Sequence, residues 1–270
     1  MRNLPATLDD TYRLALAGIG EPRWTHAHRL FQCVAVAYRP LLVEELAGFL
    51  AFDFIAGHPR PKFLSDRRRQ HPERAVLSTT TNLLVVVPEG NSRPIQFCHH
   101  SVKDFLTSER IAKDEPNISR YRILDQPAHS IVAQACLTLL LELGCDINIG
   151  QIKAFPLARY AALHWIDHAR REGLSSSIQN SMRQLLDWGK PQIAIWLWLC
   201  DVVLQYSLCA VSQNVTSLIT NLDGFDAFCN ITFPIIEHSQ NVCFYLYSLI
   251  YKASDERCYG VHIVFNSKST

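Results

Sequence analysis

The stretch LVVVPEGNSRPIQFCHHSVKDFL, residues 84–106, carries the clearest structural signal in the chain. Its first part, residues 84–98, places apolar and β-branched residues on both sides of a Pro-Glu-Gly-Asn sequence, which predicts a β-hairpin. Ile95 and Phe97 fall on one face of the returning strand. Ser101 is followed three positions later by an aspartate, as in a capping box, so we expect a helix to begin directly after the hairpin.

Three helical patterns precede this hairpin. Thr7 has the pattern of a capping box for the first, and the apolar residues of all three recur at helical spacing. We expect these helices at residues 8–18, 24–38 and 43–52. Residues 53–71 are predicted to form a loop, and residues 73–82 fit either a strand or a short helix. Three short helices followed by a hairpin are the parts of a winged helix.

The second half of the chain is predicted to be helical. Apolar helical patterns, delimited by prolines and glycines, occur at residues 125–143, 156–172 and 177–188. We therefore predict a mainly α fold, with a winged-helix-like region that contains one β-hairpin, followed by an all-helical domain. The expected domains are a linking helix and winged-helix-like domain at 1–110, a helical domain at 111–201, and an atypical C-terminal segment at 202–270, for which poor order is one interpretation.

The composition is that of a folded protein. The 270 residues are 48% hydrophobic and 19% charged, with a formal net charge of +1. A charge so close to neutral argues against the clustered basic surface that nucleic-acid binding needs. The nine cysteines are odd in number and form no C-x-x-C pair, which indicates reduced thiols. Because the N-terminus also has no pattern of a secretory signal, we expect a cytoplasmic protein.

No pattern of catalytic residues points to an enzyme. The sequence has no G-x-S-x-G, no H-E-x-x-H and no paired-carboxylate motif, and we expect no catalytic activity. His164 and His168 lie four positions apart on one predicted helix face, which would supply half of a zinc site. No suitable carboxylate or cysteine stands nearby to complete it, so we favour a core or interface role and expect neither a metal nor a cofactor.

Two further segments allow more than one interpretation. Arg67, Arg68 and Arg69 form a basic run that would suit nucleic acid or acidic lipid, although three arginines in a polar loop are usually solvated. Residues 193–211 are apolar enough to suggest a membrane span, but Asp201 lies within them, and a mid-bilayer aspartate costs about 2.5–3.5 kcal/mol. We therefore expect a buried helix here, and neither nucleic acid nor a membrane as a partner.

Several separate blocks of the sequence share one resemblance. These blocks are AHRLFQCVAVA at 27–37, RPLLVEELA at 39–47, IQFCHHSVKDFL at 95–106, FPLARYAA at 155–162, and KP with WLWL at 190–199. In this order they resemble the region after the NACHT NTPase domain in fungal NLR-like (STAND) signalling proteins, a family that commonly continues into ankyrin repeats. The resemblance covers roughly residues 4–201, and it implies a winged helix followed by a helical domain.

The resemblance implies a role for His99. In NLR-type switches, a histidine between the hairpin and the following helix contacts the β-phosphate of ADP held by the NTPase domain. The N-terminus of a helix beside it would also favour an anion. The alternative interpretation is a histidine whose hydrogen bonds are satisfied within the junction of strand and helix. His100 is assigned no role.

Two features of the family are missing from this sequence. The Walker A loop, G-x-x-x-x-G-K-[ST], is absent: the only Gly-Lys pair, at Gly189, is followed by a proline, so this chain cannot itself cradle phosphates. The Thr-Pro-Leu-His block of ankyrin repeats is absent after residue 201. The chain therefore resembles a regulatory fragment, a truncated paralogue or an imperfect gene model.

These observations lead to one principal hypothesis and two alternatives. The first is a non-catalytic regulatory or scaffold fragment of a NACHT-type signalling protein, with an NTPase domain in trans or an oligomer of related chains as its partner. The second is a winged-helix nucleic-acid-binding protein, for which Arg74 and Asn82 on the predicted recognition helix give thin support. The third is an enzyme without a recognisable motif, for which the sequence offers no discriminating feature.

Overall fold

The computed structural model describes residues 7–54, 58, 60–68, 70–143, 149–171 and 175–187, and positions 192, 193, 195, 196, 199 and 200. Met1–Trp196 and Leu197–Thr270 form two separate compact units, and nearly all described residues belong to the first. The expected segment 202–270 and most of the apolar stretch 193–211 lie outside the described residues. The expected boundary near residue 110 remains a prediction.

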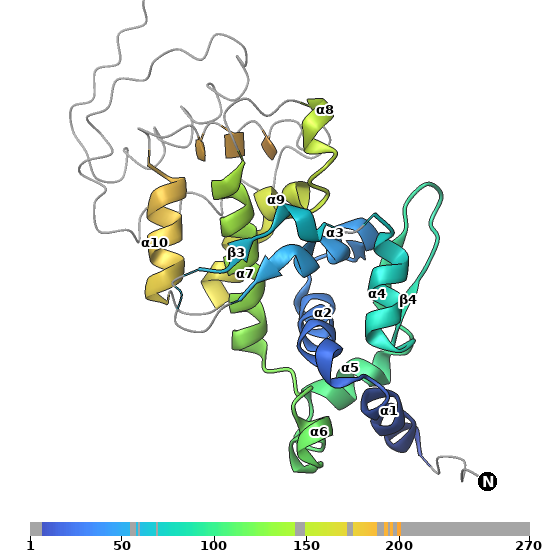
Figure 1. Cartoon of the computed structure of the whole chain (residues 1–270). Helices are drawn as coiled ribbons and strands as arrows, with labels where there is room; N and C mark the ends of the chain where they lie inside the picture. The colour runs from blue at the N-terminus through green and yellow to red at the C-terminus, as the bar shows by residue number, and fades with distance from the viewer. Residues whose placement is uncertain are drawn as a thin grey trace, which may run out of the picture. The chain divides into compact units, whose positions relative to one another are not determined.

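The first half of the chain folds as three helices, a hairpin and a further helix, preceded by a linking helix (Figure 1). The elements in chain order are α1 (Leu8–Ala17), α2 (Trp24–Val36), β1 (Leu41–Leu42), α3 (Val43–Gly48), β2 (Phe52–Asp53), β3 (Lys62–Phe63), α4 (Pro72–Thr80), β4 (Leu84–Val86), β5 (Pro94–Phe97) and α5 (His100–Thr107). The predicted hairpin is therefore confirmed as β4 and β5, and the helices expected at 8–18, 24–38 and 43–52 correspond to α1, α2 and α3. The winged-helix-like arrangement stays a prediction.

A small antiparallel sheet holds this region together. Its strand order is β1-β5-β4, so the returning strand of the hairpin lies in the middle, and Ile95 pairs with Leu41 on one side and Val86 on the other. Strand β1, which has only two residues, was not among the predicted elements. The prediction that residues 53–71 form a loop throughout was wrong, because β2 and β3 pair there with Phe52 opposite Phe63. Strands this short have no periodicity that a pattern can reveal.

Residues 73–80 of the ambiguous segment 73–82 are helical and form most of α4. Proline at its first position has a fixed φ suited to a helix start. The threonines that favoured a strand are accommodated because Thr79 and Thr80 donate their hydroxyls to carbonyls four residues earlier, at 2.7 and 3.0 Å. Thr81 then ends the helix in the left-handed region, at φ 46°.

The second half of the described chain is helical. Its helices are α6 (Pro116–Ser119), α7 (Asp125–Glu142), α8 (Ile149–Ile152), α9 (Leu157–Arg171) and α10 (Ser176–Leu185). The long helix α7 packs against α2, α9 and α10 and is therefore apolar around most of its surface. The prediction of a mainly α protein is confirmed. Within the described residues, no helix combines the length and apolar character needed to cross a membrane.

Two contacts join the elements from α1 to α5 to the segments that follow them. Gly48, the last residue of α3, lies so close to Leu157 of α9 that an added Cβ would stand 3.2 Å from the Cβ of Leu157. Phe31 on α2 contacts both Phe97 on β5 and Tyr121, with ring centroids 6.2 Å apart in each pair. Phe31 is fully buried, so these rings belong to a continuous core.

Candidate functional site

His99 occupies the N-cap position of α5, between the hairpin and the helix. Its backbone is extended (φ −152°, ψ 146°), and its ring Nδ1 accepts a hydrogen bond from the backbone N–H of Ser101 at 3.3 Å. The predicted capping box at Ser101 is therefore wrong. The helix begins at His100. The imidazole nitrogen of His99 accepts the hydrogen bond from the free N–H of Ser101, a role that a serine or threonine hydroxyl often has at the start of a helix.

The hydrogen bonds of Ser101 define the tautomer of a neutral His99 ring. The Oγ atom of Ser101 lies 2.6 Å from Nδ1 of His99 and 2.6 Å from the hydroxyl of Tyr12 on α1. A backbone N–H can only donate, so Nδ1 must be an acceptor, and a neutral ring then carries its proton on Nε2. Within the part of the chain that the structure describes, this Nε2 has no hydrogen-bond partner, and the side chain is exposed.

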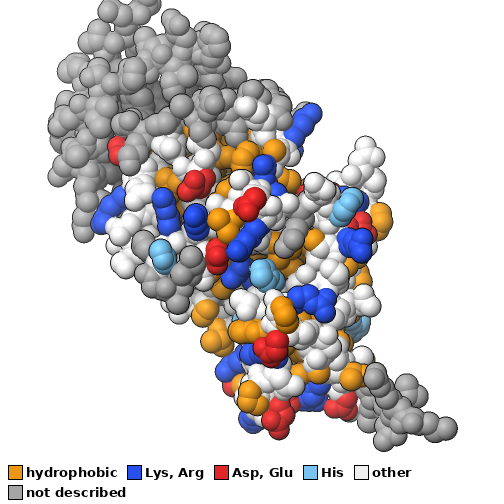
Figure 2. All heavy atoms as spheres, viewed as in Figure 1, with side chains coloured by type: hydrophobic (Ala, Val, Ile, Leu, Met, Phe, Trp, Pro, Cys, Tyr) orange, Lys and Arg blue, Asp and Glu red, His pale blue; other side chains and the backbone are white. Residues whose placement is uncertain are grey.

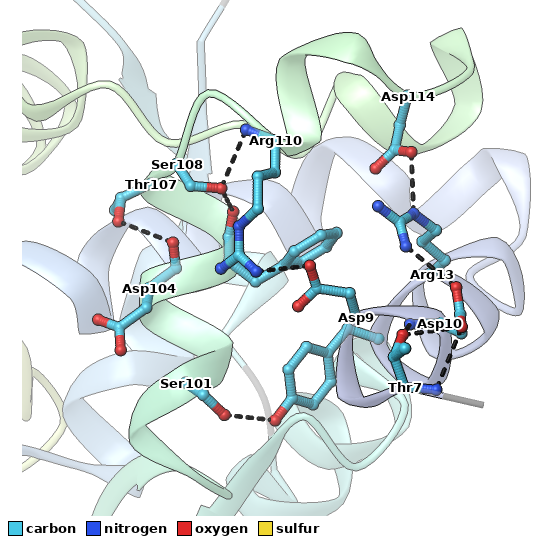
Figure 3. A network of polar contacts seen from close by, with 12 residues as sticks. Thr7, Asp9, Asp10, Arg13, Ser101, Asp104, Thr107, Ser108, Arg110 and Asp114 are labelled. Carbon is cyan, nitrogen blue, oxygen red and sulfur yellow. Dashed lines mark hydrogen bonds and ion pairs between the residues drawn. The ribbon is translucent and has the colours of Figure 1, made fainter. Parts of the chain in front are cut away.

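The helix α1 is held against α5 and the segment after it by ion pairs and rings (Figure 3). Arg13 Nε donates to Asp114 Oδ1 at 2.8 Å, and Arg110 Nη1 donates to Asp9 Oδ2 at 2.6 Å. The fully buried ring of Phe105 lies among both guanidinium groups and the ring of Tyr12, whose centroid is 5.8 Å away. Tyr12 is thereby fixed beside Ser101.

A second group of polar side chains lies buried where α7 meets α9. His168 is completely buried; its Nδ1 is 2.8 Å from Nδ1 of His129, and its Nε2 is 2.8 Å from the hydroxyl of Tyr160. That hydroxyl accepts the backbone N–H of Tyr38 at 3.3 Å. The ring of Tyr38 also stacks on His164, with centroids 6.0 Å apart.

Burial controls the protonation of this group. It lowers the pKa of His168 to about 3, and the neighbouring His129 and His164 act in the same direction. Burial also lowers the pKa of His129, against the opposing effect of Asp125. Both histidines are therefore neutral near pH 7, so the 2.8 Å contact between them is a hydrogen bond from one Nδ1–H to the other Nδ1.

The two histidines of the candidate half zinc site, His164 and His168, have different contacts. His168 uses both ring nitrogens within the protein, while the ring of His164 lies against Tyr38. Among the described residues, no group of three or more His, Cys, Asp or Glu side chains is arranged to hold a metal ion. Sequence patterns missed His129, because it is 39 residues from His168 and no local spacing connects them.

Two arginines of the basic run, Arg67 and Arg68, form contacts within the protein. Arg67 lies 3.5 Å from Asp53, and Arg68 donates to the backbone oxygen of Ala154 at 3.0 Å. Arg69 lies outside the described residues. On the face shown in Figure 2, basic and acidic side chains of the described part are interspersed with apolar ones. Arg74 on α4 is exposed.

Comparison with known proteins gives one distant similarity. No protein-family model matches the chain, and no solved structure matches it. The azaphilone pigments biosynthesis cluster protein L of Monascus ruber is 27% identical over 206 residues, which cover 73% of this chain and 42% of that protein. The chain thus spans about two fifths of the length of this curated relative.

Proposed function

We propose that the chain is a non-catalytic regulatory part of a NACHT-type NLR-like signalling protein and acts in the cytoplasm. Its partner is an NTPase domain, supplied by another chain or by an oligomer of related chains, and His99 contacts the β-phosphate of ADP in that domain. The observation that carries this proposal is the Nε2 of the exposed His99, which is a hydrogen-bond donor because Nδ1 accepts from Ser101.

The chemistry of the junction suits a phosphate. An N–H donor that has no hydrogen-bond partner among the described residues can bind a phosphate oxygen without first breaking an intramolecular hydrogen bond. The N-terminus of α5 directly after His99 adds a favourable dipole for an anion. The resemblance of residues 95–106 to the corresponding family block adds support.

In this arrangement the partner domain supplies the loop that binds the phosphates of the nucleotide. This chain has no Walker A loop, so His99 contributes one contact to a phosphate that another domain holds. Such a contact stabilises the closed, ADP-bound arrangement of the two domains and has no effect when the domains are apart. The regulatory consequence is a population shift toward the closed state, by the free energy of that contact.

The test is ADP retention in a chimaera that joins a related NACHT domain to this chain. A hydrogen bond to a charged group contributes about 1.5–3 kcal/mol, so His99→Ala should speed ADP loss by about tenfold to a hundredfold. The matched control is His71→Ala, which removes another exposed histidine at the N-cap of α4 that makes no side-chain capping bond. Equal retention in His99→Ala and the parent chimaera would eliminate the proposed phosphate contact.

A further inference from the structure

The hydroxyl of Tyr12 is connected to His99 through a single side chain. Tyr12, 5% exposed, belongs to α1, yet its hydroxyl lies 2.6 Å from Ser101 Oγ, 89 residues away in sequence. Ser101 Oγ is in turn 2.6 Å from His99 Nδ1. Figure 3 shows the first of these contacts, with Ser101 on α5 and the network of α1 around it.

The directions of these hydrogen bonds follow from what each atom can do. Nδ1 of His99 accepts from the Ser101 amide, so the Ser101 hydroxyl in contact with it must also donate to it. The hydroxyl proton of Ser101 is then used, and its oxygen accepts the proton of Tyr12. The chain therefore runs Tyr12 O–H to Ser101 Oγ–H to His99 Nδ1, and it leaves the proton of the ring on Nε2.

We propose that Tyr12 and Ser101 are positioning residues for His99, so that the seating of α1 controls whether His99 presents an N–H to a phosphate. The importance of this positioning for signalling rests on the proposed function, whereas the hydrogen-bonded chain from Tyr12 to His99 does not depend on it. When α1 is seated, both hydroxyls hold the ring in one tautomer and one direction. When α1 is displaced, the Ser101 hydroxyl loses the hydrogen bond from Tyr12 and can turn away from the ring. Nδ1 of His99 then keeps only the longer 3.3 Å bond from the Ser101 amide, so the other tautomer becomes accessible.

The contacts of α1 link its position to the hydrogen bonds of His99. Tyr12 is fixed by the Phe105 ring and by two ion pairs, Arg13 with Asp114 and Arg110 with Asp9. These pairs are partly exposed and individually weak. The linking helix and the candidate phosphate contact thus share one hydrogen-bonded chain, so movement of α1 changes the hydrogen bonds of His99 without any contact between α1 and the nucleotide.

The experiment measures the tautomer of His99 in the full chain by ¹⁵N NMR of labelled histidines, with His99→Gln to assign its signals. The wild-type protein should show one tautomer, with Nδ1 unprotonated and Nε2 protonated. Tyr12→Phe keeps the ring against Phe105 and removes only the hydroxyl, and it should move both nitrogen signals toward an average of the two tautomers. Ser101→Ala should do so more strongly, whereas Ser101→Thr, which keeps a hydroxyl, should restore the single tautomer.

The matched control is Tyr121→Phe, since the buried hydroxyl of Tyr121 has no hydrogen-bond partner among the described residues. It should leave the signals of His99 unchanged. A proton on Nδ1 in the wild type, or unchanged signals in Tyr12→Phe, would overturn the inference.

Nucleotide retention separates this inference from the proposed function. In the chimaera, Tyr12→Phe should speed ADP loss by about threefold to tenfold, which corresponds to one ordinary hydrogen bond. If Tyr12→Phe alters the tautomer while His99→Ala leaves ADP retention unchanged, the positioning stands and the proposed function fails. If His99→Ala speeds ADP loss while Tyr12→Phe changes neither measurement, the proposed function stands and the positioning fails.

Discussion

Nδ1 of His129 on α7 lies 2.8 Å from Nδ1 of His168 on α9. Only one of the two nitrogens can carry a proton at this distance, so the tautomers of the two rings are coupled. When Tyr160 donates to His168 Nε2, His168 donates from Nδ1 to His129, whose remaining N–H then points toward Asp125, 3.6 Å away. Protonating both rings would place two N–H groups against each other, so the stability of this part of the core depends on pH.

Acid should therefore destabilise the protein through His168. Its folded-state pKa is about 3 against an ordinary value of 6.5, so below pH 6.5 the unfolded chain binds a proton that the folded chain does not. Stability due to this group is complete above pH 6.5 and is lost as the pH falls toward 3, by up to about 1.4 kcal/mol per pH unit. Denaturant unfolding at pH 7 and pH 5 should show a loss of about 2 kcal/mol from this group.

His168→Gln removes that titration and should make the loss between pH 7 and pH 5 smaller by about 2 kcal/mol, although the variant is less stable at pH 7. The exposed His71 provides the control, and His71→Gln should lose as much as the wild type. The same loss in all three proteins would show that His168 does not titrate on unfolding.

Arg39 and Glu45 form an ion pair with a large expected effect on stability. Glu45 is 2% exposed, and Arg39 binds both of its carboxylate oxygens, at 2.6 and 2.7 Å. Arg39→Ala leaves a buried charge without its partner, so we expect a loss of about 3 kcal/mol. This is the lower end of the usual range, because the Arg39 side chain is 35% exposed. Chemical denaturation measures the effect.

The control for this prediction is an exposed pair. Arg67 and Asp53 lie 3.5 Å apart with side chains 44% and 37% exposed, so Arg67→Ala should cost less than about 1 kcal/mol. A double variant, Arg39→Met with Glu45→Leu, should be less destabilised than Arg39→Ala, since it leaves no buried charge. If Arg39→Ala and Arg67→Ala cost the same, the buried pair contributes no more than a surface one.

Gly48 should tolerate no larger side chain. An added Cβ would meet the Cβ of Leu157 at 3.2 Å, so Gly48→Val forces α3 and α9 apart, and we expect a loss of about 1–3 kcal/mol. Gly20 is the matched control, because the nearest atoms to its added Cβ are 3.9 Å away. Thermal unfolding should give Gly20→Val a melting temperature close to that of the wild type. A similar value for Gly48→Val would contradict the close approach of these helices.

The nucleic-acid alternative predicts binding that falls steeply with salt. We expect no duplex DNA binding at about 50 mM salt, because Arg67 and Arg68 are engaged by Asp53 and by the backbone of Ala154. Fluorescence anisotropy with a labelled duplex tests this. Binding that weakens with added salt and is lost in Arg74→Ala would favour the alternative over the signalling role.

Local sequence determined the elements whose signals are contained within a few residues. Thr7 and Asp10 form the predicted capping box of α1, because both partners lie within one turn. The hairpin of β4 and β5 followed from its turn residues, and α9 from the spacing of its apolar residues. Such features depend on backbone preferences and periodicity, which the sequence displays directly.

Tertiary structure alone decided the contacts on which the candidate sites depend. Packing pairs Tyr12 with Ser101 and His129 with His168 across 89 and 39 residues, and no local pattern links such positions. It also made His99 the cap of α5 in place of Ser101, because the extended backbone of His99 brings its ring to the free N–H of Ser101. Periodicity locates a helix, whereas the identity and direction of a buried polar contact depend on which helices pack together.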